Sequence, residues 1–156
     1  MDKEIAFVVK EEILRNVLKT HTIILLLGWR GTGKTVSSLR AMKGLWKPYY
    51  FNASGSSSRE ELYQHNDDVI VVGQLNELPK TLSAETVLLI DDFDGAAEEV
   101  VAAVKKFISE RSFPGKILIT AQAQPKLDEV GPSVDAVVRM KEGTAQVLHT
   151  RLRDIS

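Results

Sequence analysis

Short apolar runs recur along the chain between polar segments, and their length is that of β-strands. Residues 23–27 read Ile-Ile-Leu-Leu-Leu, an uninterrupted apolar run of the kind found in parallel strands that are buried on both faces. Aromatic and β-branched residues, which favour strands, dominate several of the other runs. The strands predicted in this way are residues 23–27, 49–52, 69–72, 86–90, 116–120 and 136–140. Glu142-Gly143 then predicts a turn into a last strand, 146–152, to form a hairpin.

The segments between these runs carry helical spacing. Helices are predicted over residues 7–19, 36–45, 59–65 and 96–111, with a brief helical turn within 74–80 and a loop or single turn over 125–130. Lys47-Pro48 is expected to end the second helix, because proline disfavours helix at the residue before it. In the first helix the pattern places Val8, Ile13, Val17 and Leu18 on the buried side and Lys10, Glu11, Arg15 and Lys19 on the other. In the fourth, Val100, Val104, Phe107 and Ile108 form the buried face.

Strands that alternate with helices predict an α/β fold with a mainly parallel sheet. We expect three layers, with helices on both faces of the sheet, and a C-terminal β-hairpin. Ligands bind such sheets at the carboxyl ends of the strands. Polar residues follow three of the predicted strands at that end, namely those of segments 28–35, 91–92 and 120–122. We therefore expect the functional site at this edge.

Composition narrows the class of protein. The chain has 156 residues, 44% hydrophobic and 26% charged, which suggests one globular domain over 1–156. A formal net charge of −1 does not indicate a strongly basic nucleic-acid-binding domain. The absence of cysteine excludes disulfides, and the scattered histidines lack zinc-ligand spacing. The longest apolar run is too short to cross a membrane and the first residues are charged, so we expect a cytoplasmic protein without membrane insertion.

The segment after the first strand carries the clearest chemical signal. Residues 28–35 read Gly-Trp-Arg-Gly-Thr-Gly-Lys-Thr, which fits the phosphate-binding pattern Gly-x4-Gly-Lys-[Ser/Thr] between a strand and a helix. Glycines let the backbone N–H groups point inward as an anion nest, and the following helix adds its N-terminal dipole. Lys34 can reach the β- and γ-phosphates, and the Thr35 hydroxyl can ligate Mg²⁺. The nucleotide-binding residues predicted are Gly28, Trp29, Arg30, Gly31, Thr32, Gly33, Lys34, Thr35 and Val36.

A second signal lies at the end of the strand at 86–90, where Asp91 and Asp92 follow four apolar residues. A carboxylate at this position can hold Mg²⁺ opposite Thr35, directly or through water. Asp92 can orient or deprotonate an attacking water. The alternative is that this pair is only a polar strand end that caps a turn.

The two motifs together resemble the Walker A and Walker B segments of the P-loop NTPases. An acid directly after the Walker B aspartate is the mark of the ATPase branch with an additional strand between the two motif strands. Residues 117–120 are similar to that strand, which implies that Thr120 or Gln122 is the polar sensor at its end. The usual catalytic acid of the branch is glutamate, and Asp92 is shorter by one methylene.

A narrower resemblance is to the FtsK/HerA class of DNA-pumping ATPases, which includes viral genome-packaging ATPases. It rests on Arg111 in a helix-to-strand turn, Gly115, an apolar strand, Gln122 and the terminal hairpin. The resemblance implies that Arg111 is an arginine finger acting on a neighbouring subunit, and hence a homo-oligomer, a ring or at least a dimer, that works on DNA. The alternative is an ordinary solvated arginine at a helix C-terminus.

The sequence thus predicts an enzyme that hydrolyses ATP with Mg²⁺, with Lys34, Asp92, Thr120, Gln122 and Arg111 as catalytic residues and Thr35 and Asp91 as metal ligands. Its partner would be DNA or a DNA-processing protein. A nucleotide-dependent switch or loader-type ATPase that acts on a protein partner is the alternative. A small-molecule kinase is disfavoured, since no arginine lies between Gln122 and Val134 to form a lid. The base preference is left open.

Overall fold

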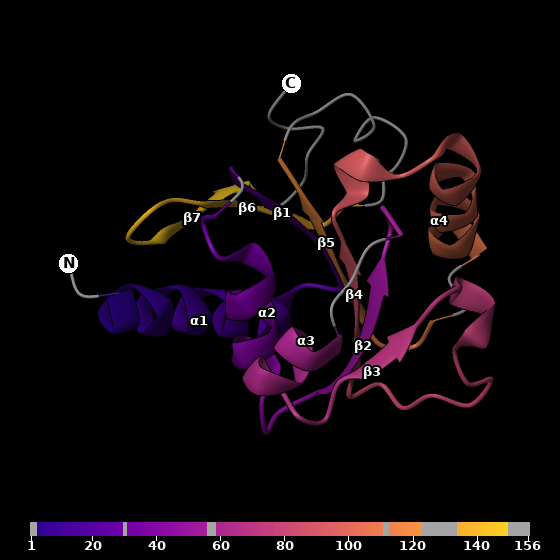
Figure 1. Ribbon diagram of the computed structural model, residues 1–156, viewed down its shortest axis with the longest axis horizontal. Helices are drawn as coiled ribbons and strands as arrows, with labels where there is room; N and C mark the ends of the chain where they lie inside the picture. Colours follow the sequence, from indigo (N-terminus) through magenta and orange to yellow (C-terminus); the bar gives the residue numbers. More distant parts are fainter. Residues whose placement is uncertain (1–2, 30, 56–58, 111–112, 123–133, 150–156) are drawn as a thin grey trace.

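The computed structural model describes residues 3–29, 31–55, 59–110, 113–122 and 134–149. Its elements in order are α1 (Lys3–Thr20), β1 (Ile23–Leu27), α2 (Lys34–Met42), β2 (Lys47–Asn52), α3 (Arg59–His65), β3 (Ile70–Val72), η1 (Leu75–Glu77), β4 (Thr86–Asp91), η2 (Phe93–Gly95), α4 (Glu98–Glu110), β5 (Lys116–Ala121), β6 (Ala136–Met140) and β7 (Ala145–His149). Figure 1 shows α1, α2 and α3 gathered on one side of the strands and α4 on the other.

The seven strands form one sheet in the order β3-β2-β4-β5-β1-β6-β7. The pairs among β1 to β6 are parallel, and β6 and β7 form an antiparallel hairpin. Because β5 lies between β1 and β4, the strand that was expected between the two motif strands is found there. The mainly parallel α/β sheet with helices on both faces and a terminal hairpin confirms the predicted fold class.

Alternating residues of the central strands supply two separate apolar cores. In β1, Ile24 and Leu26 face the core formed with α1, α2 and α3, whereas Leu25 and Leu27 face the core formed with α4. This alternation has the period of two that a strand imposes, and it explains why β1 must be apolar throughout. Apolar packing on both faces of the sheet therefore fixes the positions of the central strands, and with them the polar residues at their ends.

The boundary of α2 differs from the prediction. The helix ends at Met42 rather than near Leu45, and Gly44 follows with φ 79°. A glycine in the left-handed region is a common helix terminator, so the stop signal is Gly44 and not Lys47-Pro48. Those two residues instead begin β2, where a proline close to the strand start is tolerated.

The structure of helix α1 differs more from its prediction than that of α2. It begins at Lys3 rather than Phe7, and the prediction of its buried face is partly wrong. Val8 is 56% exposed, whereas Lys10 is only 4% exposed. Leu14, Val17 and Leu18 are buried against α2, as the periodicity requires. A polar contact made by Lys10, described below, overrides the simple amphipathic pattern.

Other predictions lie partly or wholly outside the described residues, namely the loop over 125–130 and the end of the last strand beyond His149. Within the described part of the chain, no helix is both long and apolar enough to cross a membrane.

Candidate phosphate-binding site

The loop between β1 and α2 is anchored at its start and at its end. The Gly28 N–H donates to the Ala121 carbonyl at 3.1 Å, which ties the loop to β5. A Cβ at Gly28 would lie 2.8 Å from Thr32 Oγ1 and 3.0 Å from Met140 Cβ, so only glycine fits there. Gly33 has φ 84° and precedes the first residue of α2. The glycine spacing of the motif is thus explained by a close approach and by a left-handed backbone turn.

Lys34 is the first residue of α2, and its side chain folds back over the loop. The Nζ group donates to the Gly28 carbonyl and, at 3.3 Å, to the Trp29 carbonyl. The ammonium therefore lies against the loop backbone at the N-terminal end of a nine-residue helix. The cation and the helix dipole both favour an anion at this position.

Asp91 lies at the end of β4, is 8% exposed, and accepts hydrogen bonds from three hydroxyl groups. Thr35 Oγ1 donates to Oδ2 at 2.8 Å, and Tyr50 OH donates to the same oxygen at 2.7 Å. Thr120 Oγ1 donates to Oδ1. Three donors from three different elements fix the orientation of this carboxylate.

Tyr50 was not among the predicted site residues, and its position depends on a chain of contacts from β2. The Ser54 N–H donates to Asn52 Oδ1 at 2.9 Å, so the Asn52 amide nitrogen must face Tyr50, to which it donates at 3.0 Å. The Tyr50 proton is then left for Asp91. Burial, and next the Asp91 charge and hydrogen bond, raise the pKa of Tyr50 well above its usual range.

Asp92 has a left-handed backbone with φ 56°, which aspartate tolerates better than most residues. Its N–H donates to Thr120 Oγ1 at 2.9 Å. The Thr120 hydroxyl, 1% exposed, is thus fully engaged between the two aspartates. Gln122, in contrast, has an exposed side chain, and its N–H donates to Asp94.

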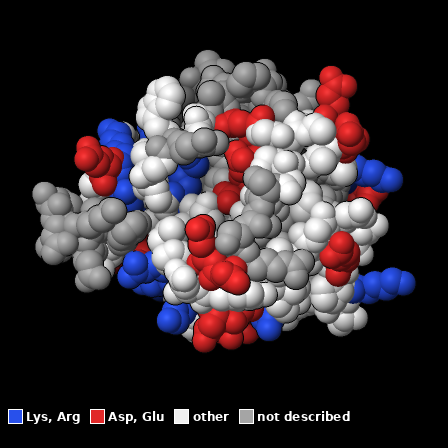
Figure 2. All heavy atoms as spheres, in the orientation of Figure 1, with Lys and Arg blue, Asp and Glu red and all other residues white. Residues whose placement is uncertain are grey.

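A cavity of about 300 Å³ brings these groups together. It is lined by Gly31, Gly33, Lys34, Thr35, Val36, Asn52, Asp91, Asp92, Thr120, Ala121 and Gln122. Nine of these were predicted, and Asn52 and Ala121 were not. Acidic side chains line a hollow near the upper centre of the face in Figure 2, with basic side chains to their left.

The remaining predicted residues lie elsewhere. Gly28 and Thr32 belong to the loop but do not line the cavity, and Trp29 is 77% exposed. Arg30 and Arg111 lie outside the described residues, so the structure gives no position for either.

The side chains around the cavity fit a hard divalent cation that arrives with a phosphate. Thr35 and Asp91 offer a hydroxyl and a carboxylate, which are oxygen ligands that Mg²⁺ accepts. Among the described residues, no group of three or more histidine, cysteine or acidic side chains could hold a metal ion alone. Mg²⁺ commonly binds through one or two protein oxygens, water and substrate phosphates, so this sparse donor set fits it.

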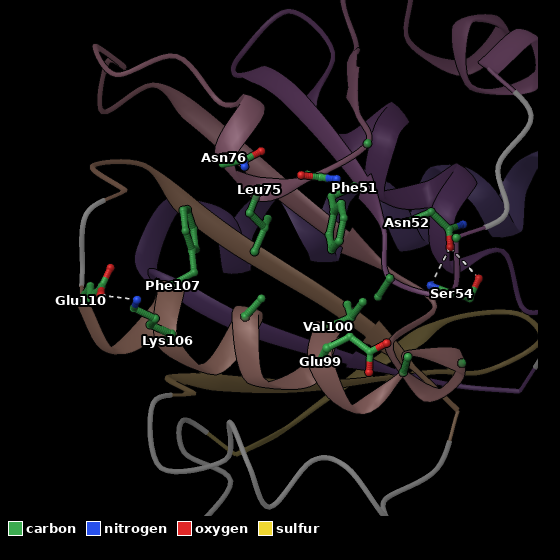
Figure 3. Close-up of a pocket in the computed structure, with 17 residues that line it drawn as sticks. Phe51, Asn52, Ser54, Leu75, Asn76, Glu99, Val100, Lys106, Phe107 and Glu110 are labelled. Carbon is green, nitrogen blue, oxygen red and sulfur yellow. Dashed lines mark hydrogen bonds and ion pairs between the residues drawn. The ribbon is translucent and has the colours of Figure 1, made fainter.

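A second, larger cavity of about 700 Å³ lies between α4 and the ends of β2 and β3. Figure 3 shows Phe51, Leu75 and Phe107 pointing into it, and Asn52 and Ser54 at one end. Asn52 lines both cavities and donates to Tyr50, so this groove borders the hydrogen-bonded chain that leads to Asp91.

Comparisons with known proteins bear on the fold. No family model and no curated protein matches the chain. Among solved structures, the chain is similar to the assembled ATPase EscN, in complex with its central stalk EscO, from the type III secretion system of enteropathogenic E. coli. The TM-score is 0.53 at 16% identity, over 82% of this chain and 45% of the EscN chain. At this identity the likeness concerns the fold alone: the chain has a P-loop NTPase-like α/β fold.

Proposed function

We propose that this chain is a Mg²⁺-dependent ATPase. One observation carries the proposal: Thr35 Oγ1 donates to Asp91 at 2.8 Å inside a cavity that Lys34 and Asp92 also line. A hydroxyl and a carboxylate for the metal, a cation for the phosphates and a second carboxylate for water are the groups that nucleotide hydrolysis requires.

The loop binds the triphosphate. Its backbone N–H groups and the N-terminus of α2 provide positive potential, and Lys34 adds a full charge. In the structure the Lys34 ammonium donates to two loop carbonyls. Phosphate oxygens are anionic acceptors and make stronger partners, so the ammonium would move from the carbonyls to the β- and γ-phosphates. Thr35 and Asp91 would hold Mg²⁺, which supplies neutralisation of the charge that develops on the phosphates.

Asp92 performs the proton transfer in this proposal. It lines the cavity beside Asp91, and its backbone is held by Thr120. A water oxygen attacks the γ-phosphorus, the bond to the bridging oxygen breaks, ADP leaves, and Asp92 takes the water proton. Gln122 is the better placed sensor of the γ-phosphate, since its side chain is exposed at the cavity whereas the Thr120 hydroxyl is committed to Asp91 and Asp92.

We further propose that the protein assembles into a homo-oligomer and uses the free energy of ATP hydrolysis to do work on DNA. The assembly is supported by the fold likeness to EscN, itself described as an assembled ATPase. The work on DNA, and an arginine finger at Arg111, are supported only by the sequence resemblance to the FtsK/HerA class. A switch that acts on a protein partner is the alternative outcome.

The direct test is steady-state phosphate release with Mg²⁺-ATP over a range of protein concentrations, with and without DNA. We expect turnover in the wild type and loss of about 10²-fold or more in Asp92→Asn, with ATP binding retained, because general-base catalysis contributes about that much. Asp67→Asn, at an exposed carboxylate outside the site, is the matched control and should turn over normally.

The outcomes separate the alternatives. Specific activity that rises with protein concentration supports assembly, and stimulation by DNA supports work on DNA. Tight ATP binding without release under every condition would favour the switch. Normal turnover in Asp92→Asn would remove Asp92 as the base.

A further inference from the structure

Lys10 is a buried cation on α1, a helix that the proposed reaction does not use. Its side chain is 4% exposed, and its Nζ donates to the Thr32 carbonyl in the phosphate loop at 2.8 Å. Burying an ammonium is costly unless it is paired, so this position is not explained by apolar packing of α1. The contact joins residues 22 positions apart and reaches the loop from outside the cavity.

The geometry of the peptide bond gives this contact a consequence inside the loop. In a trans peptide the carbonyl and the following N–H point in opposite directions. The Thr32 carbonyl is directed at Lys10, so the Gly33 N–H is directed away from Lys10. The next peptide is fixed by the helix itself, because the Gly33 carbonyl accepts from the Ser37 N–H at 2.8 Å.

Gly33 therefore lies between two peptide planes that are held by different partners. Its φ is 84°, and glycine populates positive and negative φ about equally. The backbone conformation of Gly33 is therefore not fixed by the residue itself and depends on the contacts of the two neighbouring peptides. Gly33 lines the phosphate cavity. We propose that Lys10 is a positioning residue of the phosphate loop: it holds the Thr32 carbonyl so that the Gly33 N–H stays available to a nucleotide phosphate.

The positive charge of Lys10 also favours phosphate binding by the loop. The positive charge of Lys10 lies next to a loop that would bind a polyanion, and it raises the local potential without touching the ligand. Burial lowers the pKa of Lys10, while Glu142 in the β6–β7 turn raises it. Lys10 thus lies where α1, the phosphate loop and the terminal hairpin meet.

The inference rests on the proposed function, and a matched control separates positioning of the loop from docking of the helix. Arg15 also ties α1 to α2, through Nε to the Ala41 carbonyl at 3.2 Å, but it makes this contact away from the loop. Lys10→Met removes the donor and the charge at similar length. Arg15→Met removes a contact of the same kind, from α1 to a backbone carbonyl, but to α2 rather than to the loop.

The experiment measures ADP affinity by titration calorimetry, without Mg²⁺, and amide hydrogen exchange of the loop in the absence of nucleotide. For Lys10→Met we expect ADP affinity about tenfold weaker, as for loss of a charged hydrogen bond, and faster exchange at Gly33. Arg15→Met should bind ADP with an affinity within about twofold of wild type at temperatures where it is folded, since the contact from Lys10 to Thr32 is intact in this variant. Lys10→Arg should recover most of the affinity.

The possible results separate positioning of the loop by Lys10, docking of α1, and failure of the proposed function. Wild-type ADP affinity and exchange in Lys10→Met would overturn the inference and leave the proposed function standing. An equal loss in Arg15→Met would also overturn it, because docking of α1 would then be the cause. If the wild type itself binds no ADP, the proposed function fails, and the exchange data alone still test the contact. If Lys10→Met does not fold, Lys10→Gln takes its place; it removes the charge and keeps only a shorter, neutral donor, so we expect a loss of ADP affinity in the same direction but smaller, and wild-type affinity and exchange would again overturn the inference.

Discussion

At the scale of single residues, the proposed function gives Lys34 the most direct role in nucleotide binding. Its ammonium lies against the loop carbonyls of Gly28 and Trp29 and is within the cavity. We predict that Lys34→Ala weakens ADP binding by about tenfold or more, because a charge-assisted contact to phosphate is lost. Calorimetric titration measures this directly. Lys43→Ala, at an exposed lysine just after α2, is the control, and an equal loss there would show that the effect is only one of net charge.

Thr120 is the residue that joins the two aspartates. Its hydroxyl donates to Asp91 and accepts the Asp92 N–H at 2.9 Å, and it is 1% exposed. We predict that Thr120→Val lowers the free energy of unfolding by about 1–3 kcal/mol, because the buried Asp91 carboxylate loses a donor and the partly buried Asp92 N–H loses its acceptor. Turnover should fall as well, since the Asp91 carboxylate and the Asp92 backbone each lose an orienting contact.

The conservative variant Thr120→Ser keeps the hydroxyl and should retain most of the stability and activity. Urea unfolding and phosphate release provide the two measurements. If Thr120→Val is as stable and as active as Thr120→Ser, the hydroxyl has no such role.

At the scale of elements, the start of β5 depends on a close approach to β4. A Cβ at Gly115 would collide with the Thr86 carbonyl and would lie 2.9 Å from Phe113 Cε1. Backbone in a paired strand cannot easily move, so we predict that Gly115→Ala destabilises the protein by about 1–3 kcal/mol or more. Gly73→Ala is the matched control, because its Cβ would meet only the end of the Glu77 side chain, 3.2 Å away.

Urea unfolding of both variants tests this prediction. The expected order is a large loss for Gly115→Ala and a loss within about 0.5 kcal/mol for Gly73→Ala, as for most surface changes. Equal unfolding midpoints for Gly115→Ala and the wild type would mean that β5 can shift away from β4.

The elements also show what the sequence can predict. The strands were identifiable because their apolar runs are local and because both faces of the sheet are covered. That Asp91, Asp92 and residues of the loop would lie together at one edge of the sheet was predictable, because each segment directly follows a predicted strand. Tyr50 and Asn52 were not, because their role depends on β2 lying beside β4, with Asn52 in register with Asp91. Lys10 was placed on the wrong side of α1, because its polar contact to Thr32 outweighs helical periodicity.

At the scale of the whole molecule, two cores hold the sheet, and a buried polar cluster at the strand ends lies between them. Tyr50 is the member of this cluster whose ionisation can be followed in the stability of the entire chain. It is 2% exposed, and burial beside Asp91 raises its pKa above the ordinary value of 10.0. The folded protein therefore keeps the phenol protonated at pH values where the unfolded chain loses the proton.

The raised pKa of Tyr50 in the folded state makes the stability of the protein fall at high pH. Below pH 10 both states are protonated and the stabilisation is complete; above pH 10 the unfolded state ionises first, so stability falls as pH rises. Tyr50→Phe cannot ionise. We predict that the stability of the wild type relative to Tyr50→Phe falls by about 1.4 kcal/mol from pH 9 to pH 11, so that the variant becomes the more stable of the two. Burial lowers the pKa of Lys10 and of Lys116, and both have the opposite dependence, but both residues are present in wild type and variant and cancel.

Urea unfolding midpoints at pH 8, 9, 10 and 11 for the two proteins measure this difference. At pH 8 the variant should be less stable by about 1 kcal/mol, because Asp91 loses one donor and Asn52 loses its acceptor. A difference that stays constant from pH 8 to pH 11 would show that Tyr50 ionises alike in both states. It would then follow that solvent reaches the Tyr50 phenol in the folded protein, whereas equal stability at pH 8 would show that Asp91 is oriented by Thr35 and Thr120 without help from Tyr50.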